Sequence, residues 1–256
     1  MTDESNIVLY QVDGGLARIT LNRPEKRNAL NEALVAGLKD ALRQANDDAA
    51  VRVVVITGAG RDFCAGADLA ALQRISEASV SENAADARSL MELFLLMRQV
   101  DVPVIAAVQG RALAGGCGLA SACDIVLAST GARFGYPEVK IGFVPAMVTA
   151  ILRRTVSEKR AFELLTRGAE ITAEEARQIG LVNHVFSEES FAAEVTVYAR
   201  GFENISRSAV ALTKSLLYQI DGMAFVEALA TGVDTNLIAR MTDDAQKGIA
   251  SFLKRE

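Results

Sequence analysis

Two apolar runs, each followed by a glycine-rich loop and then by a helical pattern, constrain the fold of this chain most. The first run is Val51–Thr57, rich in β-branched residues, and the second is Val104–Val108, which follows Pro103. Strands read as apolar runs without regular polar alternation when helices cover both faces of a mainly parallel sheet. The sequence therefore predicts an α/β core over roughly the first three quarters of the chain.

Weaker signals extend this pattern on both sides. Ile7–Val12 and Leu16–Leu21 are short apolar or alternating runs separated by Asp13-Gly14-Gly15, which is typical of a β-hairpin. A further short strand is predicted at 124–128. Apolar residues before the first buried run recur at helical spacing and predict a strand-helix-strand crossover; they are Leu34, Leu38, Ala41, Leu42 and Ala45.

The C-terminal part of the chain shows helical periodicity alone. Thr172 and Glu175 fit a capping box at a helix start, and no strand pattern follows 182–186. We therefore divide the chain into an α/β core at 1–190 and a helical C-terminal subdomain at 191–256. Because no linker rich in Pro or Ser separates them, we expect the helices to dock on the core and to pack on a neighbouring subunit.

Charge and composition disfavour several classes of protein. The formal net charge is −5, and 27 Lys and Arg residues are scattered among 32 Asp and Glu residues, so no basic footprint for nucleic acid is visible. The N-terminus lacks the pattern of a signal peptide, and no stretch approaches the about 18 apolar residues of a membrane span. Three cysteines without metal-ligand spacing and one histidine indicate a reduced, cytoplasmic protein without a metal site.

The loop after the first buried run is the first candidate site. It reads Phe63-Cys64-Ala65-Gly66-Ala67-Asp68-Leu69 and precedes a helical stretch. Small residues let a ligand approach the main chain, and a helix N-terminus offers N–H groups without intrahelical partners to a developing negative charge. The alternative is a tight loop that enters a helix and has no function of its own.

The loop after the second buried run has the same character. It spans Gln109–Leu119 and contains Gly115, Gly116 and Gly118. These glycines could instead serve close helix-strand packing. Nucleotide binding is disfavoured, because neither this loop nor the earlier Gly58-Ala59-Gly60 completes a third glycine or continues into Lys-Ser or Lys-Thr.

A single carboxylate marks the third candidate segment, which spans Ala132–Pro145. Glu138 lies between Pro137 and Val139 in an aromatic and aliphatic setting, where desolvation would raise its pKa towards the range useful for proton transfer. The alternative is a solvated residue in a turn or in the first turn of a helix. A Ser-His-Asp hydrolase is disfavoured, because His184 has no paired nucleophile motif, and Cys117 is more typical of packing than of nucleophilic catalysis.

These three segments, in this order and spacing, resemble the enoyl-CoA hydratase/isomerase (crotonase) family. Leu21–Leu30, which reads LNRPEKRNAL, and Ile179–Val182 resemble it as well. The resemblance implies a spiral of ββα units with a helical C-terminal region, assembled as a homotrimer or homohexamer. It also implies an acyl-CoA substrate, with coenzyme A as part of the substrate and no separate cofactor.

The resemblance also implies roles for individual residues. The main-chain N–H groups of Ala67 and Gly115 would form an oxyanion hole for the thioester oxygen. Phe252 and Lys254 would reach the nucleotide end of CoA, from this chain or another subunit. The sequence itself, through the apolar residues Phe94, Tyr136, Phe143 and Met147, favours an apolar acyl pocket. The remaining positions expected to contact substrate are Lys26, Arg27, Ala65, Gly66, Asp68, Leu69 and Gly116.

The chain departs from the family pattern at one catalytic position. Typical hydratases of the family carry two glutamates, and here the second is Glu138 while the first position is Gly118. Hydration is our first hypothesis and isomerisation of the double bond our second, since one base can move a proton between C2 and C4. A non-catalytic acyl-CoA-binding subunit, and decarboxylation or thioester hydrolysis aided by Asp68, Arg88 or Glu92, are the further alternatives.

Overall fold

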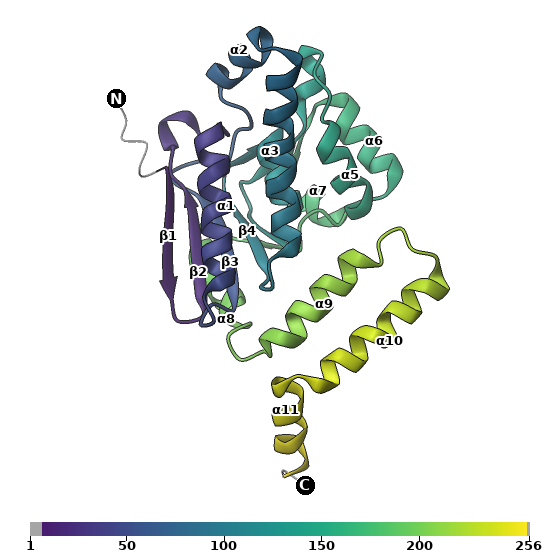
Figure 1. The fold of residues 1–256 in the computed structure, drawn as a ribbon. Coiled ribbons are helices and arrows are strands. Elements are labelled where there is room, and N and C mark those ends of the chain that lie inside the picture. Colours follow the sequence, from purple (N-terminus) through teal and green to yellow (C-terminus); the bar gives the residue numbers. More distant parts are fainter. Residues whose placement is uncertain (1–6, 255–256) are drawn as a thin grey trace.

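A computed structural model describes residues 7–254, apart from the side chain of Leu69. It contains two sheets surrounded by helices, with the N-terminal hairpin at one edge (Figure 1). The strands are β1 Val8–Asp13, β2 Leu16–Leu21, β3 Val53–Gly58, β4 Val104–Val108, β5 Arg111–Leu113, β6 Ile125–Ser129, β7 Arg133–Gly135, β8 Glu170–Thr172 and β9 His184–Phe186. The helices are η2 Pro24–Lys26, α1 Glu32–Asp47, α2 Leu69–Glu77, α3 Val80–Gln99, α4 Gly115–Ala122, η3 Pro137–Ile141, α5 Ala146–Thr155, α6 Glu158–Arg167, α7 Ala173–Gln178, α8 Phe191–Arg200, α9 Arg207–Gln219, α10 Phe225–Met241 and α11 Asp243–Leu253.

The larger sheet has the order β1-β2-β3-β4-β6-β9, and only the β1-β2 hairpin is antiparallel. The smaller sheet has the order β5-β7-β8, with β5 and β7 parallel and β8 antiparallel. Both predicted buried runs are strands, although the first begins at Val53 because Val51 and Arg52 still belong to the turn after α1. The predicted α/β class with a mainly parallel sheet is confirmed.

The chain alternates between the two sheets. After β4 it enters the smaller sheet as β5 and continues into α4, and after β6 it enters the smaller sheet again as β7. Each passage therefore adds one strand to each sheet before a helix follows. This places the ends of β3 and β5, and the loops that follow them, close together, as the isolated bridge between Cys64 and Ala112 shows.

Helices cover both faces of the larger sheet. One face packs against α1 and α3 within the main hydrophobic core, while α8 packs on the other through Phe191, Val195 and Ala199. β4 is accordingly buried at every residue, which explains its apolar sequence. α8 therefore completes this layer, and the boundary at 190/191 remains a prediction.

Two helices begin with the capping residues that the sequence offers. Asn31 caps α1 by accepting a hydrogen bond from the N–H of Leu34, and the predicted capping box of Thr172 and Glu175 opens α7. Among residues 7–254, no helix is both long and apolar enough to cross a bilayer.

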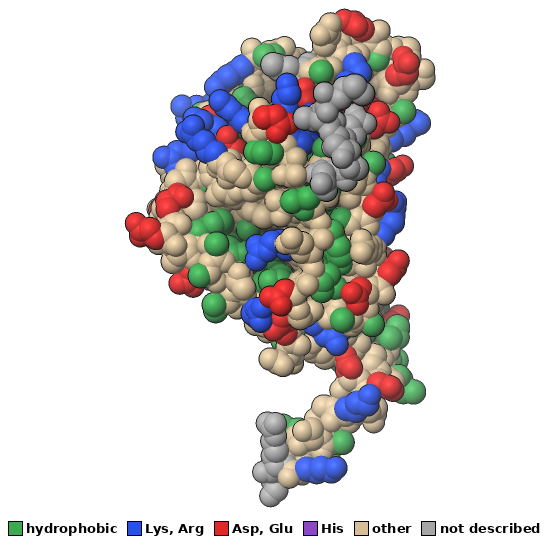
Figure 2. All heavy atoms as spheres, turned by 90° about the vertical axis from the view of Figure 1, so that its left-hand side faces the viewer, with side chains coloured by type: hydrophobic (Ala, Val, Ile, Leu, Met, Phe, Trp, Pro, Cys, Tyr) green, Lys and Arg blue, Asp and Glu red, His purple; other side chains and the backbone are tan. Residues whose placement is uncertain are grey.

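A buried lysine anchors the C-terminal helices to the core. Lys214 of α9 is 8% exposed, lies 2.8 Å from the carboxylate of Asp124, and donates to the carbonyls of Met97 and Val102. In contrast, α10 and α11 bury none of their described residues in this chain. α10 lies alongside α9, and α11 extends away from the rest of the molecule (Figure 1 and Figure 2). The predicted helical character of this region is confirmed.

Candidate active site

A cavity of about 730 Å³ lies between the loop after β3, the start of α4 and the helices α2, α3, η3 and α5. Three predicted catalytic positions, Ala67, Gly115 and Glu138, line it together. Most of the remaining wall is apolar. The apolar side chains that line the cavity are Leu30, Val35, Leu72, Ile75, Leu90, Pro137, Ile141, Phe143, Val144, Pro145, Met147 and Val148.

The peptide group between Gly66 and Ala67 leaves the N–H group of a cavity-lining residue without an acceptor among the described residues. The carbonyl of Gly66 accepts a hydrogen bond of 2.7 Å from the N–H of Leu30. In a trans peptide the N–H points opposite to the carbonyl, so the N–H of Ala67 points away from Leu30. No acceptor for it exists among residues 7–254, which leaves this donor available to a ligand.

The second N–H group belongs to Gly115 at the N-terminus of α4. The carbonyl of Ala114 accepts from the N–H of Gly118 along the helix, so the N–H of Gly115 points out of the helix end. It too lacks an acceptor within the described part of the chain. Ala114 holds a positive φ of 50°, which is unfavourable for a residue with a Cβ and shows that the surrounding contacts fix this turn.

Two glycines allow the loops to approach each other closely. A Cβ at Gly116 would lie 2.2 Å from the carbonyl oxygen of Cys64, and one at Gly66 would lie 2.8 Å from Cβ of Ala114. Gly66 also has a φ of +96°. Their smallness therefore serves the contact between the loops, and Gly116 does not line the cavity as a predicted substrate contact would.

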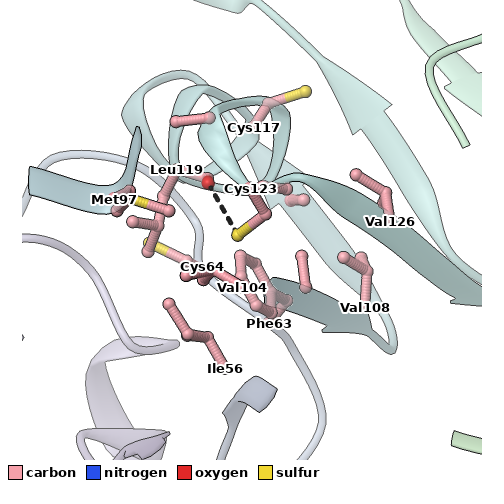
Figure 3. Packing of buried hydrophobic residues seen from close by; sticks show 14 of the residues in the cluster. Ile56, Phe63, Cys64, Met97, Val104, Val108, Cys117, Leu119, Cys123 and Val126 are labelled. Atoms are coloured by element: carbon pink, nitrogen blue, oxygen red, sulfur yellow. Dashed lines mark hydrogen bonds between the residues drawn. The ribbon is translucent and has the colours of Figure 1, made fainter. Parts of the chain in front are cut away.

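The cysteines beside this contact belong to the hydrophobic core (Figure 3). Cys64 and Cys117 are fully buried, and burial raises the pKa of each thiol to about 12. Both thiols are therefore neutral near pH 7, as the packing interpretation of Cys117 predicted.

Glu138 presents its carboxyl group to the cavity from η3. It is half-buried, its Oε2 atom has no hydrogen-bond partner among the described residues, and burial raises its pKa above the ordinary value. A carboxyl group held in this way exchanges protons more readily near neutral pH than a solvated one. Glu138 does lie in the first turn of a helix, as the alternative allowed, but it is half-buried and not solvated.

The position of the missing carboxylate is filled by a neighbouring side chain. Gly118 is buried in α4, and a Cβ there would lie 2.6 Å from Cγ2 of Val148 in α5 and 3.5 Å from Cζ of Phe94 in α3. Val148 lines the cavity and is only 5% exposed. The wall at this point is therefore apolar and closed, and leaves no room for a second acid/base.

We expect Gly118→Ala to lower the free energy of unfolding by about 1–2 kcal/mol, because overpacking against Val148 outweighs the helix propensity of alanine. In a Val148→Ala background the same substitution should be neutral or stabilising, by up to about 1 kcal/mol. Urea unfolding of the four proteins in this cycle measures the coupling. Equal effects in both backgrounds would contradict the contact.

Other predicted site residues lie in different places. Tyr136 is fully buried in the core, with its hydroxyl 2.8 Å from that of Ser121, so it cannot line the acyl pocket as predicted, while Phe143 does line the cavity. Ala65 lines it too. Asp68 caps α2 and pairs with Arg23, so its carboxylate is already engaged. The predicted contact of Leu69 lies outside the described side chains.

The expected CoA contacts divide into two groups. Lys26 and Arg27 lie on and beside η2, outside the cavity wall, and the carbonyl of Arg27 accepts from the N–H of Ala65. Phe252 and Lys254 lie at the end of α11, exposed and away from the cavity of this chain. Within one chain, therefore, these two C-terminal residues do not join the site.

Sequence reasoning missed two residues that shape the site. Val148 gave no signal, because only the packing of α5 on α4 brings it to Gly118. Arg23 lies inside the segment that carried the family resemblance, yet its partner Asp68 is 45 positions away in sequence. The available signal was the opposite charge of the two residues: Arg23 lies in the LNRPEKRNAL segment, and Asp68 lies at a predicted helix N-terminus.

Comparisons with known proteins define the class to which this fold and site belong. The family model described as enoyl-CoA hydratase/isomerase matches residues 11–256. The crystal structure of an enoyl-CoA hydratase from Mycobacterium smegmatis is similar, with a TM-score of 0.93 and 32% identity over 98% of both chains. The molecule is thus an enzyme of the crotonase fold, and the predicted fold class is confirmed.

Similar sequences make the assignment more specific. The chain is 41% identical over 248 residues to a Thermus thermophilus protein provisionally named an enoyl-CoA hydratase, covering 96% of this chain and 98% of the relative. It is 37% identical to the crotonyl-CoA hydratase of Syntrophomonas wolfei, covering 98% and 95%. It is also 37% identical to the 2,3-dehydroadipyl-CoA hydratase of Escherichia coli, covering 93% and 91%.

The chain belongs to the enoyl-CoA hydratase/isomerase family. It is a hydratase-type enzyme that acts on an acyl-CoA thioester, as the first hypothesis from the sequence stated. The alternative of a non-catalytic binding subunit is therefore set aside.

Proposed function

We propose that this enzyme adds water across the 2,3 double bond of an enoyl-CoA thioester with Glu138 as its one acid/base. The observation that carries the proposal is that three groups line one apolar cavity: the unpartnered backbone N–H groups of Ala67 and Gly115, and the carboxyl group of Glu138, whose Oε2 atom has no partner among the described residues. Such donors stabilise the charge that develops on the thioester oxygen when a nucleophile attacks C3.

One carboxylate suffices for both proton transfers. The water oxygen attacks C3 while the carboxylate of Glu138 takes one water proton, and the electron pair of the double bond moves through C2 to the thioester oxygen. The N–H groups of Ala67 and Gly115 hold the resulting enolate. The enolate then takes the proton back from Glu138 at C2, which yields the 3-hydroxyacyl-CoA and restores the carboxylate.

The cavity wall supports an apolar acyl chain as the substrate class. Beyond Glu138 the wall is formed by side chains such as Phe143, Met147 and Leu90, and Val148 closes it next to Gly118. We place the CoA moiety along Ala65–Leu69 and the exposed Lys26 and Arg27, whose charges suit phosphate groups. Coenzyme A enters as part of the substrate, and no further cofactor takes part in these steps.

A substrate panel tests the proposed reaction. Crotonyl-CoA, longer 2-enoyl-CoA esters and a 3-enoyl-CoA are each incubated with the enzyme while the ultraviolet absorbance of the conjugated thioester is followed. Hydration consumes the conjugated esters and lowers their absorbance. An increase with the 3-enoyl ester, without loss from the conjugated ones, would replace hydration by isomerisation, which the single carboxylate also permits.

The rate of hydration should depend on the ionisation of Glu138. The proton-accepting form is the carboxylate, so kcat/KM should be high above the pKa of this group and fall as the pH decreases through it. Because burial raises this pKa, the fall should begin at a higher pH than the ordinary value of 4.5 allows. A pH–rate profile measures the midpoint, and a midpoint at or below 4.5 would contradict the buried carboxylate.

We propose that α10 and α11 pack on further copies of this chain to form a homotrimer or homohexamer. Their apolar side chains are exposed in one chain, among them Leu229, Val233 and Leu237, at 57%, 60% and 55%. Such a contact would also bring Phe252 and Lys254 near the CoA site of a neighbour. The cytoplasmic location remains a prediction.

The double substitution Leu229→Lys/Val233→Lys should convert the assembly to smaller species, because two charges would enter an apolar contact. Light scattering coupled to size exclusion measures the mass of both proteins. Substitution of the exposed Glu194 by Lys on α8 is the control for added surface charge. The same mass for the double variant and the unsubstituted protein would refute this interface.

A further inference from the structure

One buried guanidinium joins the N-terminal segment to the loop that carries Ala67. The side chain of Arg23 is 12% exposed, and its Nη2 atom lies 2.6 Å from Oδ2 of Asp68. Its Nη1 atom donates to the carbonyl of Ala29 at 2.5 Å. The planar fork of arginine serves both partners at once, which the single ammonium of lysine could not do with the same geometry.

Asp68 transmits this contact to the loop. Its Oδ1 atom accepts from the N–H of Ala70 and caps α2, while Oδ2 receives Arg23. Its own N–H donates to the carbonyl of Leu30, and the N–H of Leu30 donates to the carbonyl of Gly66. The peptide groups on both sides of Ala67 are thus fixed by the segment from Arg23 to Leu30.

The segment that fixes the loop is itself held rigidly. Asn28 is fully buried, its Oδ1 atom accepts from the N–H of Arg23, and its Nδ2 atom donates to the carbonyls of Ala59 and Asp62. Asn28 adopts a positive φ of 55° to reach these groups. Arg23 therefore starts from a fixed backbone, and its side chain can define the position of Asp68.

We propose that Arg23 is a positioning residue for the oxyanion hole, because through Asp68 and Ala29 it fixes the peptide plane that presents the Ala67 N–H. The inference rests on the proposed role of that N–H. Arg23 does not touch the cavity, so it acts on the reaction only through the loop. A displacement of about 1 Å at a reacting group can cost about 10² in rate, so a loosened loop should be visible in turnover.

The experiment measures carbonyl polarisation directly. The probe is the CoA thioester of 4-dimethylaminocinnamic acid, in which an electron-rich ring is conjugated with the thioester carbonyl. Hydrogen bonds to that oxygen favour charge transfer from the ring and move the absorption band to longer wavelength. The probe is bound to the unsubstituted enzyme, to Arg23→Lys and to Arg23→Met/Asp68→Asn.

The double variant is chosen so that it folds. Asparagine is as good an N-cap as aspartate, and replacing both partners leaves no unpaired buried charge. The matched control is Lys39→Met, since Lys39 is equally buried at 10% exposure and pairs with Glu92 at 2.9 Å, yet joins α1 to α3 instead of the loop. This variant shows how much the loss of a buried cation alone, away from the loop, changes the red shift and kcat.

The double variant should bind the probe with less than half of the red shift of the unsubstituted enzyme, and its kcat should fall by about 10- to 100-fold with KM changed less than about threefold. Arg23→Lys should give intermediate values, and Lys39→Met the full shift. A double variant that keeps the full shift and kcat would overturn the role of Arg23 but leave the oxyanion role of Ala67 intact. An unsubstituted enzyme that turns over enoyl-CoA without any shift of the bound probe would overturn the oxyanion role of Ala67, and this inference with it.

Discussion

Glu138→Gln should lower kcat for hydration by about 10²–10⁴ while the protein still folds and binds acyl-CoA. Glutamine fills the same space but can neither accept the water proton nor return it to C2. Among the described residues, the wall beside Gly118 offers no carboxylate in its place, because Val148 packs against that position. Steady-state kinetics with crotonyl-CoA, together with the binding of a non-hydrated acyl-CoA, measures the two effects separately.

The same substitution should raise the thermal stability at pH 7. Burial raises the folded-state pKa of Glu138, so the ionised form destabilises the folded protein above the ordinary pKa of 4.5, and this penalty disappears below it. The gain in Tm of Glu138→Gln should therefore shrink as the pH falls through the raised pKa towards 4.5, and be absent below 4.5. Glu194→Gln on the exposed face of α8 is the control for a lost charge. Retained turnover would contradict the acid/base role of Glu138. A Tm that does not rise at pH 7 would contradict the burial of its carboxylate.

Ala67→Pro should lower kcat by about 10²–10³, the usual effect of removing one oxyanion donor. Proline removes the N–H without removing any hydrogen bond of the fold, because that N–H has no acceptor among residues 7–254. Ala67 has no positive φ, so the φ of proline does not require a left-handed turn to be rebuilt.

Ala67→Gly is the matched comparison for this substitution. It also changes the side chain but keeps the N–H, so it should remain at least about tenfold more active than Ala67→Pro. Circular dichroism and urea unfolding confirm that both variants are folded before kinetics are compared. Equal activity of the two would show that the N–H of Ala67 does not stabilise the reacting oxygen.

The parts of this site that were predictable from the sequence are local in the chain. A buried strand, a loop of small residues and a helix start follow one another closely in the chain, and together they imply free backbone N–H groups. Both loops were found in this way, and Glu138 was found from its aromatic and aliphatic neighbours in the sequence. The orientation of the Ala67 N–H was not predictable, because it depends on the hydrogen bond between Gly66 and the distant Leu30.

The errors come from packing between distant elements. Tyr136 is aromatic, as an acyl-pocket residue could be, yet its side chain points into the core towards Ser121. No spacing rule tells whether a residue just after β7 points into the core or into the cavity. Val148 and Gly118 are a complementary pair across two helices, which a single sequence cannot show. Similarly, α10 is a helix, as the spacing of its apolar residues predicted, but none of its described residues is buried within one chain.

The fate of the proton on Glu138 tests the mechanism most directly. The enzyme is incubated with crotonyl-CoA in deuterium oxide, and proton NMR of the isolated 3-hydroxyacyl product gives the configuration of deuterium at C2 relative to the hydroxyl at C3. Because one carboxylate takes the deuteron from water and returns it from the same face, this mechanism predicts one deuterium added syn to the hydroxyl, and almost no product with Glu138→Gln. Anti addition by the unsubstituted enzyme would contradict a single acid/base at Glu138.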